Sequence, residues 1–114
     1  TDVMVVMPVP INYGAVVTCR PVGVLHMEDE SGEDAKILAV PTDDVTGLYR
    51  DVKQLEDVDQ LLRVQIEHFF DHYKDLEAGK WVNILGWGDA DAARKEILDS
   101  VERYNTLPEK PENW

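Results

Sequence analysis

The order of two hydrophobic patterns constrains the fold of this chain more than any other feature of its sequence. Short β-branched and apolar runs fill the first forty residues, whereas apolar side chains at helical spacing appear after residue 56. Strand-type segments followed mainly by helix-type segments predict an α+β domain. We therefore expect a small bent sheet or barrel covered by helices, in one domain at 1–107 with a loose tail at 108–114.

Three strands are expected in the first part of the chain. The apolar and β-branched runs at 3–7, 15–27 and 36–40 are each bounded by Pro, Gly or polar turn residues. Pro21 and Gly23 interrupt the second run, which predicts a bulge or a sharp bend there. The polar segment 42–56 is expected to be an ordered surface connection.

Two helices are expected in the second part of the chain. Asp57 and Gln60 form a capping-box pattern, and Gly79 is a natural C-cap for the helix that follows. A strand at 81–85 and a turn at 86–88 come next, and Asp89 caps a second helix. The apolar face of the first helix carries Leu62, Ile66, Phe69, Tyr73 and Leu76, and that of the second carries Ala93, Ile97, Val101 and Tyr104.

The charge and the cysteine count exclude several classes of partner. A formal net charge of -12 argues against binding nucleic acid or an anionic membrane surface, and it repels anionic substrates unless metal ions invert the local sign. Cys19 is the single cysteine, so no internal disulfide can form, and the expected compartment is the cytoplasm. Cys19 lies in an apolar run and is expected to be buried and inert.

An acidic turn that enters a strand is the first candidate site. Asp29 and Asp34 offer the oxygen ligands that Mg²⁺ and Mn²⁺ prefer, and Lys36 could hold an anion beside the metal. Asp34 and Lys36 alternate along a strand, so both side chains should point to one face. Glu28, Glu30 and Glu33 are expected on the solvated side. A solvated hairpin is the alternative for the whole turn.

Three further sets of residues are candidates with plain structural alternatives. Asp2 stands at a strand mouth, where it is either a metal ligand or a polar residue at a fraying terminus. Tyr73 is either a core aromatic or a phosphate contact, and Lys74 is either a surface cation near a helix end or its partner in that contact. His68 and His72 have the i, i+4 spacing of a metal pair, but a helix-surface or subunit-contact role is favoured because no zinc-protease pattern accompanies them.

Three segments, in this order and spacing, resemble the soluble family I inorganic pyrophosphatases, the bacterial branch most closely. The resemblance covers the chain up to about Tyr104. The segments are CRPVGVL at 19–25 with MEDESGEDAK at 27–36, HFFDHYKDLE at 68–77, and GKWV at 79–82 with GW at 86–87.

The resemblance implies an OB-like bent β-barrel flanked by two helices. It also implies Mg²⁺-dependent hydrolysis of pyrophosphate to two phosphates, and homo-oligomers that are commonly hexamers. Mn²⁺, which the same oxygen ligands suit, is the alternative ion. Matched by position, Asp2, Asp29 and Asp34 correspond to metal ligands. Asp34 and Lys36 correspond to catalytic positions, and Lys36, Tyr73 and Lys74 to groups that contact substrate oxygens. The positions of His68 and His72 are where subunit contacts are expected.

One part of the family pattern is absent from this chain. Asp2 matches the last aspartate of an Asp-x-Asp-Pro-x-Asp signature whose first two aspartates are missing. We therefore interpret the chain as the C-terminal portion of such an enzyme, with an incomplete barrel. Losing one charge-stabilising donor typically lowers a rate by ~10²–10³, so the loss of several ligands predicts little or no activity. The alternative is a catalytically impaired metal-binding and oligomerising domain of the same fold.

Overall fold

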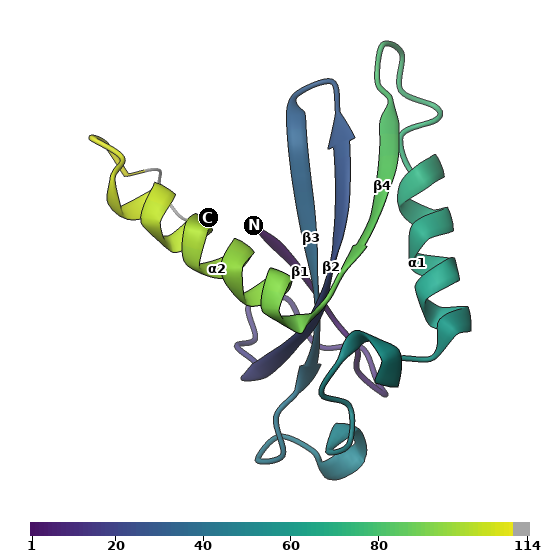
Figure 1. Cartoon of the computed structure of the whole chain (residues 1–114), viewed down its shortest axis with the longest axis vertical. Helices are drawn as coiled ribbons and strands as arrows, with labels where there is room; N and C mark the ends of the chain where they lie inside the picture. Colours follow the sequence, from purple (N-terminus) through teal and green to yellow (C-terminus); the bar gives the residue numbers. More distant parts are fainter. Residues whose placement is uncertain (111–114) are drawn as a thin grey trace.

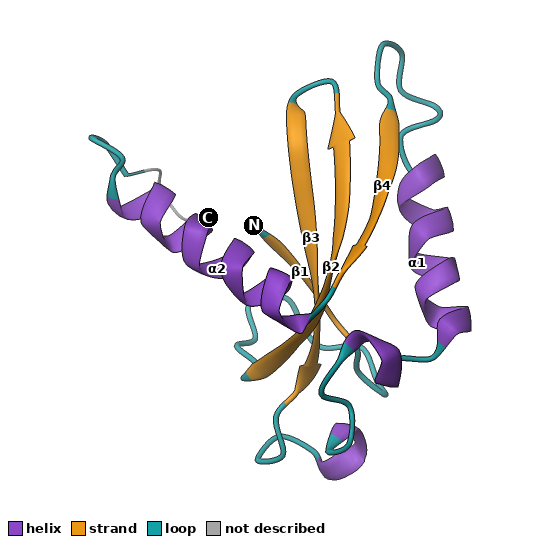
Figure 2. Ribbon diagram, in the orientation of Figure 1, coloured by secondary structure: helices purple, strands orange, loops and turns teal. Residues whose placement is uncertain are grey.

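A four-stranded mixed sheet with two helices organises residues 1–110, the part of the chain that the computed structural model describes (Figures 1 and 2). The α+β class and the two expected helices are confirmed. In chain order the elements are β1 (Asp2–Val5), β2 (Cys19–Asp29), β3 (Gly32–Pro41), the 3₁₀ turns η1 (Gly47–Tyr49) and η2 (Leu55–Asp57), α1 (Gln60–His72), β4 (Val82–Gly88) and α2 (Ala90–Asn105).

The sheet has the order β1-β3-β2-β4 and is not closed among the described residues. β2 and β3 form an antiparallel hairpin around the acidic turn, and β4 adds antiparallel to β2. β1 joins β3 in parallel, with Asp2 opposite Lys36. An open, twisted sheet flanked by helices confirms the expectation of an incomplete bent barrel.

The expected irregularity of the second strand is present, as a register shift between Pro21 and Gly23. A Cβ atom at Gly23 would lie 2.8 Å from the Leu55 side chain and 3.3 Å from the Gly88 carbonyl oxygen. Glycine therefore lets the η2 turn and the end of β4 approach the bent strand closely.

Each face of the sheet has its own hydrophobic core. On one face Val22, Leu38 and Val40 are buried together with Val58, and Leu62 and Ile66 of α1 pack against them. On the other face Val24 and Ile37 pack against Ala93 of α2. Because side chains alternate along a strand, Lys36 and Leu38 point to the α1 face and Ile37 points to the α2 face.

The first helix differs from its expected bounds at both ends. Asp59 is its N-cap, since its side chain accepts a hydrogen bond from the Leu61 amide, whereas Asp57 belongs to a capping box that closes η2 with Gln54. The helix ends at His72, so Gly79 lies in the following loop and is not the C-cap. Leu76, placed on the apolar stripe by its spacing, is fully exposed.

The second helix packs on the sheet only through its first half. Ala90 and Ala93 are buried, while Val101 and Tyr104 on the expected apolar face are 51% and 39% exposed. Figure 1 shows the far half of α2 running away from the strands. In the described part of the chain, neither helix has both the length and the apolar character that a membrane crossing requires.

Two strand boundaries differ from those expected from the sequence. β2 begins at Cys19 rather than at 15, and residues 86–88, expected as a turn, belong to β4. Residues 108–110 of the expected loose tail lie outside any helix or strand, and 111–114 are outside the described residues.

Candidate active site

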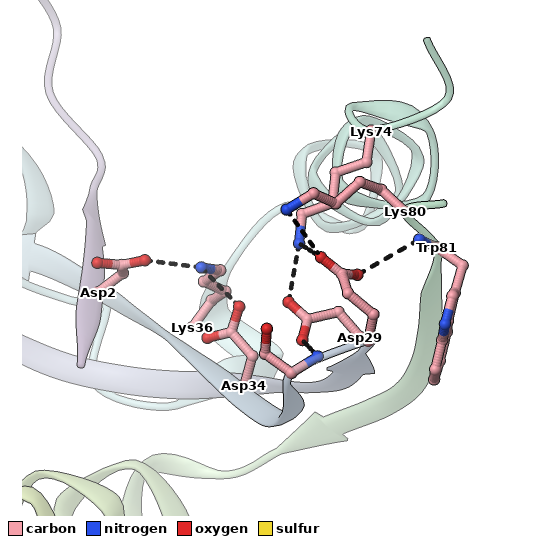
Figure 3. Close-up of polar contacts among 9 residues, drawn as sticks. Asp2, Asp29, Asp34, Lys36, Lys74, Lys80 and Trp81 are labelled. Atoms are coloured by element: carbon pink, nitrogen blue, oxygen red, sulfur yellow. Dashed lines mark hydrogen bonds and ion pairs between the residues drawn. The ribbon is translucent and has the colours of Figure 1, made fainter. Parts of the chain in front are cut away.

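A lysine held between two aspartates lies at the centre of the α1 face of the sheet. The Lys36 ammonium is 2.7 Å from the Asp2 carboxylate and 2.8 Å from that of Asp34 (Figure 3). The parallel register of β1 and β3 places Asp2 beside Lys36, and the alternation along β3 places Asp34 there. Lys36 is 7% exposed and is the one buried charged residue among those described. The expected shared face of Asp34 and Lys36 is thus present.

A second ion-pair group follows along the same face toward β4. Lys74 lies 2.9 Å from Asp29 and 3.4 Å from Glu30, and Lys80 lies 3.3 Å from the same Glu30 oxygen. The second Glu30 oxygen accepts a hydrogen bond of 3.4 Å from the Trp81 amide. Glu30, expected on the solvated side, therefore ties the loop after α1 to the acidic turn.

The pairing shifts the pKa values of the charged groups in the directions that favour their charged forms. The hydrogen bond from Lys36 lowers the pKa of Asp2, and those from Lys74 and the Ser31 amide lower the pKa of Asp29. Burial alone would lower the pKa of Lys36, but hydrogen bonds to its two aspartates outweigh it and raise that pKa. The structure therefore holds these carboxylates ionised and this lysine protonated at neutral pH.

Aromatic side chains at the end of α1 border the two ion-pair groups. The Phe70 ring centroid lies 5.6 Å from the Lys36 ammonium nitrogen, a distance suited to a cation–π contact. The Tyr73 ring centroid lies 5.5 Å from the Lys74 ammonium nitrogen, and Tyr73 is the C-cap of α1 rather than a core residue of its stripe. Within residues 1–110 the Tyr73 hydroxyl makes no hydrogen bond, so it is free to contact a ligand.

The donor chemistry of this face suits a hard divalent cation, but the donor number is incomplete. Asp2, Asp29 and Asp34 offer carboxylate oxygens of the kind that Mg²⁺ prefers. Within 1–110, however, no group of three or more Asp, Glu, His or Cys side chains is gathered closely enough to hold a metal. The Lys36 ammonium lies between Asp2 and Asp34, and Asp29 pairs with Lys74. Within the described residues the chain therefore offers carboxylate oxygens to a cation but not a complete set of ligands.

A sequence model of the inorganic pyrophosphatase family matches residues 1–105 of this chain. The chain belongs to the inorganic pyrophosphatase family. The chain is similar to inorganic pyrophosphatase 1 of Pseudomonas syringae pv. tomato, with 58% identity over 103 residues, and to the inorganic pyrophosphatase of Pseudomonas aeruginosa, with 57% identity over the same length. Each match covers 90% of this chain and 59% of the relative.

Solved inorganic pyrophosphatases share the fold. The structure from Helicobacter pylori superposes with a TM-score of 0.87 at 39% identity, and that from Coxiella burnetii with 0.86 at 44% identity. These matches cover 90% and 89% of this chain, but only 61% and 60% of the solved chains. The chain thus spans about three fifths of the length of the inorganic pyrophosphatases that it matches.

The sequence does not predict several contacts of the site. Glu30, Lys80 and Phe70 join the ion-pair groups, although the sequence predicts no role in the site for Lys80 or Phe70 and places Glu30 on the solvated side. The adjacency of Lys80 to Trp81, directly before a strand that enters the sheet beside the acidic turn, was the available signal for Lys80. Glu30 gave no signal of its own, because acidic residues are ordinary in turns.

The two histidines lie at the C-terminal end of α1 and make no contact with Asp2, Asp29 or Asp34 among the interactions of residues 1–110. Their ring centroids are 4.5 Å apart, and His72 Nδ1 lies 2.9 Å from Asp75. The hydrogen bond with Asp75 raises the pKa of His72. Cys19 is half-buried rather than buried as expected, and burial raises the pKa of its thiol.

Proposed function

We propose that this chain forms the metal- and phosphate-binding wall of an enzyme that hydrolyses inorganic pyrophosphate to two phosphates in the cytoplasm. The observation that carries the proposal is the row of paired charges on one face of the sheet, in a chain of the inorganic pyrophosphatase family. Lys36 and Lys74 supply two ammonium groups, and Asp2, Asp29 and Asp34 supply carboxylate oxygens on both sides of them.

The charges of this face explain why a cation has to accompany the substrate. Lys36 with Asp2 and Asp34 carries a net charge of about -1, and the whole chain is strongly acidic. Pyrophosphate is itself an anion, so these groups repel it until a cation neutralises the carboxylates. Mg²⁺ is the proposed ion, with Mn²⁺ as the second choice, held by Asp2, Asp29 and Asp34.

Each side chain then has a separate part in the proposed reaction. A bound divalent cation supplies Lewis-acid polarisation and lowers the pKa of water at the site. Lys36 donates to a phosphate oxygen and stabilises the charge that develops there. Lys74 and the free Tyr73 hydroxyl donate to oxygens nearer β4. Asp34 keeps Lys36 protonated and oriented through their contact of 2.8 Å.

The test is phosphate release from pyrophosphate by this chain, at high protein concentration, with Mg²⁺ and with Mg²⁺ plus EDTA. We expect slow, EDTA-sensitive release that Lys36→Met removes and Lys95→Met preserves. Lys95 is a suitable control because it lies on the exposed side of α2, and within residues 1–110 its one ion pair is with Asp99. The absence of any metal-dependent release would exclude catalysis by this chain alone.

A second function, a metal-binding and oligomerising domain with impaired catalysis, is favoured by the incomplete donor set. The exposed His68 and His72 pair on α1 is the proposed contact for homo-oligomers, with the hexamer as the expected form. Sedimentation velocity and a Mg²⁺-dependent rise in melting temperature test this function. A chain that stays monomeric and shows no Mg²⁺-dependent rise would contradict it.

A further inference from the structure

The Phe70 ring lies over the buried lysine of the site. Its centroid is 5.6 Å from the Lys36 ammonium nitrogen, and within residues 1–110 no other aromatic ring makes such a contact with Lys36. The attraction between a cation and a ring is stronger where water is excluded, and Lys36 is buried. Phe70 is itself only partly buried, and it is not among the described apolar side chains that pack against either core of the sheet. The site, rather than the core, therefore accounts for the position of this ring.

The same ring also contacts Tyr73. The Phe70 and Tyr73 ring centroids are 5.3 Å apart and their planes meet at 84°, which is the edge-to-face arrangement that aromatic pairs favour. Lys36 comes from β3, whereas Tyr73 caps α1. One side chain thus joins two groups that are proposed to contact phosphate oxygens and that come from separate elements.

The last turns of α1, which carry Phe70, are fastened to the sheet. The Trp87 indole of β4 donates to the carboxylate of Glu67, three residues before Phe70 on the helix. Because residues three apart on a helix lie on the same side of it, this hydrogen bond holds the side of α1 that carries Phe70. The backbone beneath the ring is therefore held in place by contacts outside the site.

An aromatic ring holds the ammonium without using up its hydrogen-bond donors. An ammonium group has three N–H donors, and Asp2 and Asp34 are the carboxylates within ion-pair distance of Lys36. A ring attracts the positive charge through its quadrupole but accepts a hydrogen bond only weakly. A carboxylate or carbonyl oxygen in place of the ring would engage the third donor and compete with a phosphate oxygen for it.

We propose that Phe70 is a positioning residue, which holds the Lys36 ammonium and the Tyr73 hydroxyl in one fixed relation so that both reach oxygens of the same pyrophosphate. The inference rests on the proposed function, because it takes Lys36 and Tyr73 as groups that contact phosphate oxygens. Phe70 itself acts only through these two side chains. The alternative is a packing role, in which loss of the ring lowers stability and leaves the Lys36 ammonium as it is.

The first test follows Lys36 in the chain without any ligand. Phe70→Leu keeps an apolar side chain but removes the ring. We expect nitrogen NMR relaxation to show a more mobile Lys36 ammonium in this variant, and the ring-current shift of the Lys36 Cε protons to disappear. Phe70→Tyr retains a ring and should keep both signals as they are in the original chain. This measurement does not depend on activity or on binding.

The second test measures the binding of pyrophosphate in the presence of Mg²⁺ by isothermal titration calorimetry. Phe70→Leu should weaken this binding about three- to tenfold, the range that corresponds to the loss of one partly desolvated contact between a cation and a ring. Phe70→Tyr should bind like the original chain. An original chain that binds no pyrophosphate would contradict the proposed function, and the mobility of Lys36 would then decide the role of Phe70 by itself.

Phe69→Leu is the matched control. Phe69 precedes Phe70 on α1, is 59% exposed and stacks on Tyr73 at 5.8 Å, but it makes no contact with a lysine ammonium within residues 1–110. Its substitution removes a ring from the same aromatic cluster and should change neither the mobility of Lys36 nor the affinity for pyrophosphate. Urea denaturation and circular dichroism show whether each variant folds and how much stability it loses.

Three results would overturn the proposal. The first is a Lys36 ammonium whose mobility Phe70→Leu leaves unchanged. The second is an equal effect of Phe70→Leu and Phe69→Leu, because general aromatic packing would then be responsible. The third is a Phe70→Tyr variant that behaves like Phe70→Leu, because the presence of a ring would then not be what holds Lys36.

Discussion

The Lys36 ammonium and the Asp2 carboxylate lie 2.7 Å apart because a parallel register places β1 directly beside β3. Lys36 is buried and Asp2 is largely exposed, so the pair joins the interior of the sheet to its open surface. A lysine in this position is costly to bury and is kept charged by Asp2 and Asp34 together. Such an arrangement is typical of functional sites more than of structural ones.

Lys36→Met should therefore separate stability from activity. Methionine fills the volume of the lysine stem and removes the cost of burying a charge, while Asp2 keeps its contact with water. Because the side chains of Asp2 and Asp34 are 76% and 27% exposed, we expect the free energy of unfolding, measured by urea denaturation, to fall by less than the roughly 3–5 kcal/mol that an uncompensated buried charge costs. Metal-dependent phosphate release should fall by ~10²–10³.

The contrary result for Lys36→Met would be a large loss of stability at neutral pH. It would mean that the ion pairs hold the sheet together and that the charge is structural. Lys36→Arg provides a matched comparison, because it keeps the charge but cannot place a single nitrogen between the two aspartates.

Asp29 should make the folded state sensitive to acid. Lys74 and the Ser31 amide hold the pKa of this carboxyl below its ordinary value of 3.8. A carboxyl with a depressed pKa in the folded state stabilises that state above its unfolded pKa, and the contribution disappears as the pH falls through the folded pKa. Between about pH 4 and that lower value, Asp29→Asn should weaken the dependence of stability on pH.

Urea denaturation at a series of pH values from about 2 to about 6 measures this effect, because that range spans the titration of a carboxyl group. Asp51→Asn, a matched change at an exposed aspartate outside the site, should leave the slope unchanged. Equal slopes for the Asp29→Asn variant and the original chain would show that the contact with Lys74 is not formed in solution.

The part of the site that could be predicted is the part that local geometry determines. Asp34 and Lys36 lie two residues apart in a strand, so their shared face follows from the alternation of side chains. Asp2 and Lys36 are 34 residues apart and Asp29 and Lys74 are 45 apart, so these contacts depend on the strand register and on where α1 ends. Neither quantity is encoded in a short window of sequence.

The errors in the helices have a related cause. Periodicity placed Tyr73 and Leu76 on the stripe of the first helix, but the helix ends at His72 and the chain turns toward the acidic residues. The ion pairs of Lys74 with Asp29 and Glu30 are available only in that turned conformation. Contacts across the fold therefore outweigh the local helical preference at this point.

His72 should titrate above the ordinary histidine pKa of 6.5. Its Nδ1 bonds to Asp75 at 2.9 Å, and Asp71 lies 3.6 Å from its Nε2. Because the pKa is raised, the contact stabilises the folded state fully below pH 6.5 and is lost as the pH rises through the folded pKa. Asp75→Asn should return the His72 pKa toward 6.5, which NMR titration of the ring protons measures.

Glu77→Gln is the control for this titration, since Glu77 lies in the same loop and makes no ion pair within 1–110. The His72 pKa should fall in Asp75→Asn and stay unchanged in Glu77→Gln. A His72 pKa that Asp75→Asn leaves unchanged would contradict the contact, and His68, whose ring lies 4.5 Å away, would then be the next group to examine.

Glu30→Gln should loosen the loop that carries Lys80 and Trp81. The change preserves an acceptor for the Trp81 amide but removes the charge that attracts Lys74 and Lys80. We expect faster hydrogen exchange at the Trp81 amide and a weaker hold on Lys74, with little change in global stability because ion pairs near the surface contribute little to it.

Glu33→Gln provides the matched control for this change. Glu33 lies in the same hairpin, is exposed, and forms no ion pair in the described part of the chain. Its substitution should leave the exchange of the Trp81 amide as it is. If both variants speed that exchange equally, the loss of negative charge from the hairpin is responsible, and Glu30 has no special part in fixing the loop. A selective effect of Glu30→Gln would instead make Glu30 the residue that positions Lys74 for an anion.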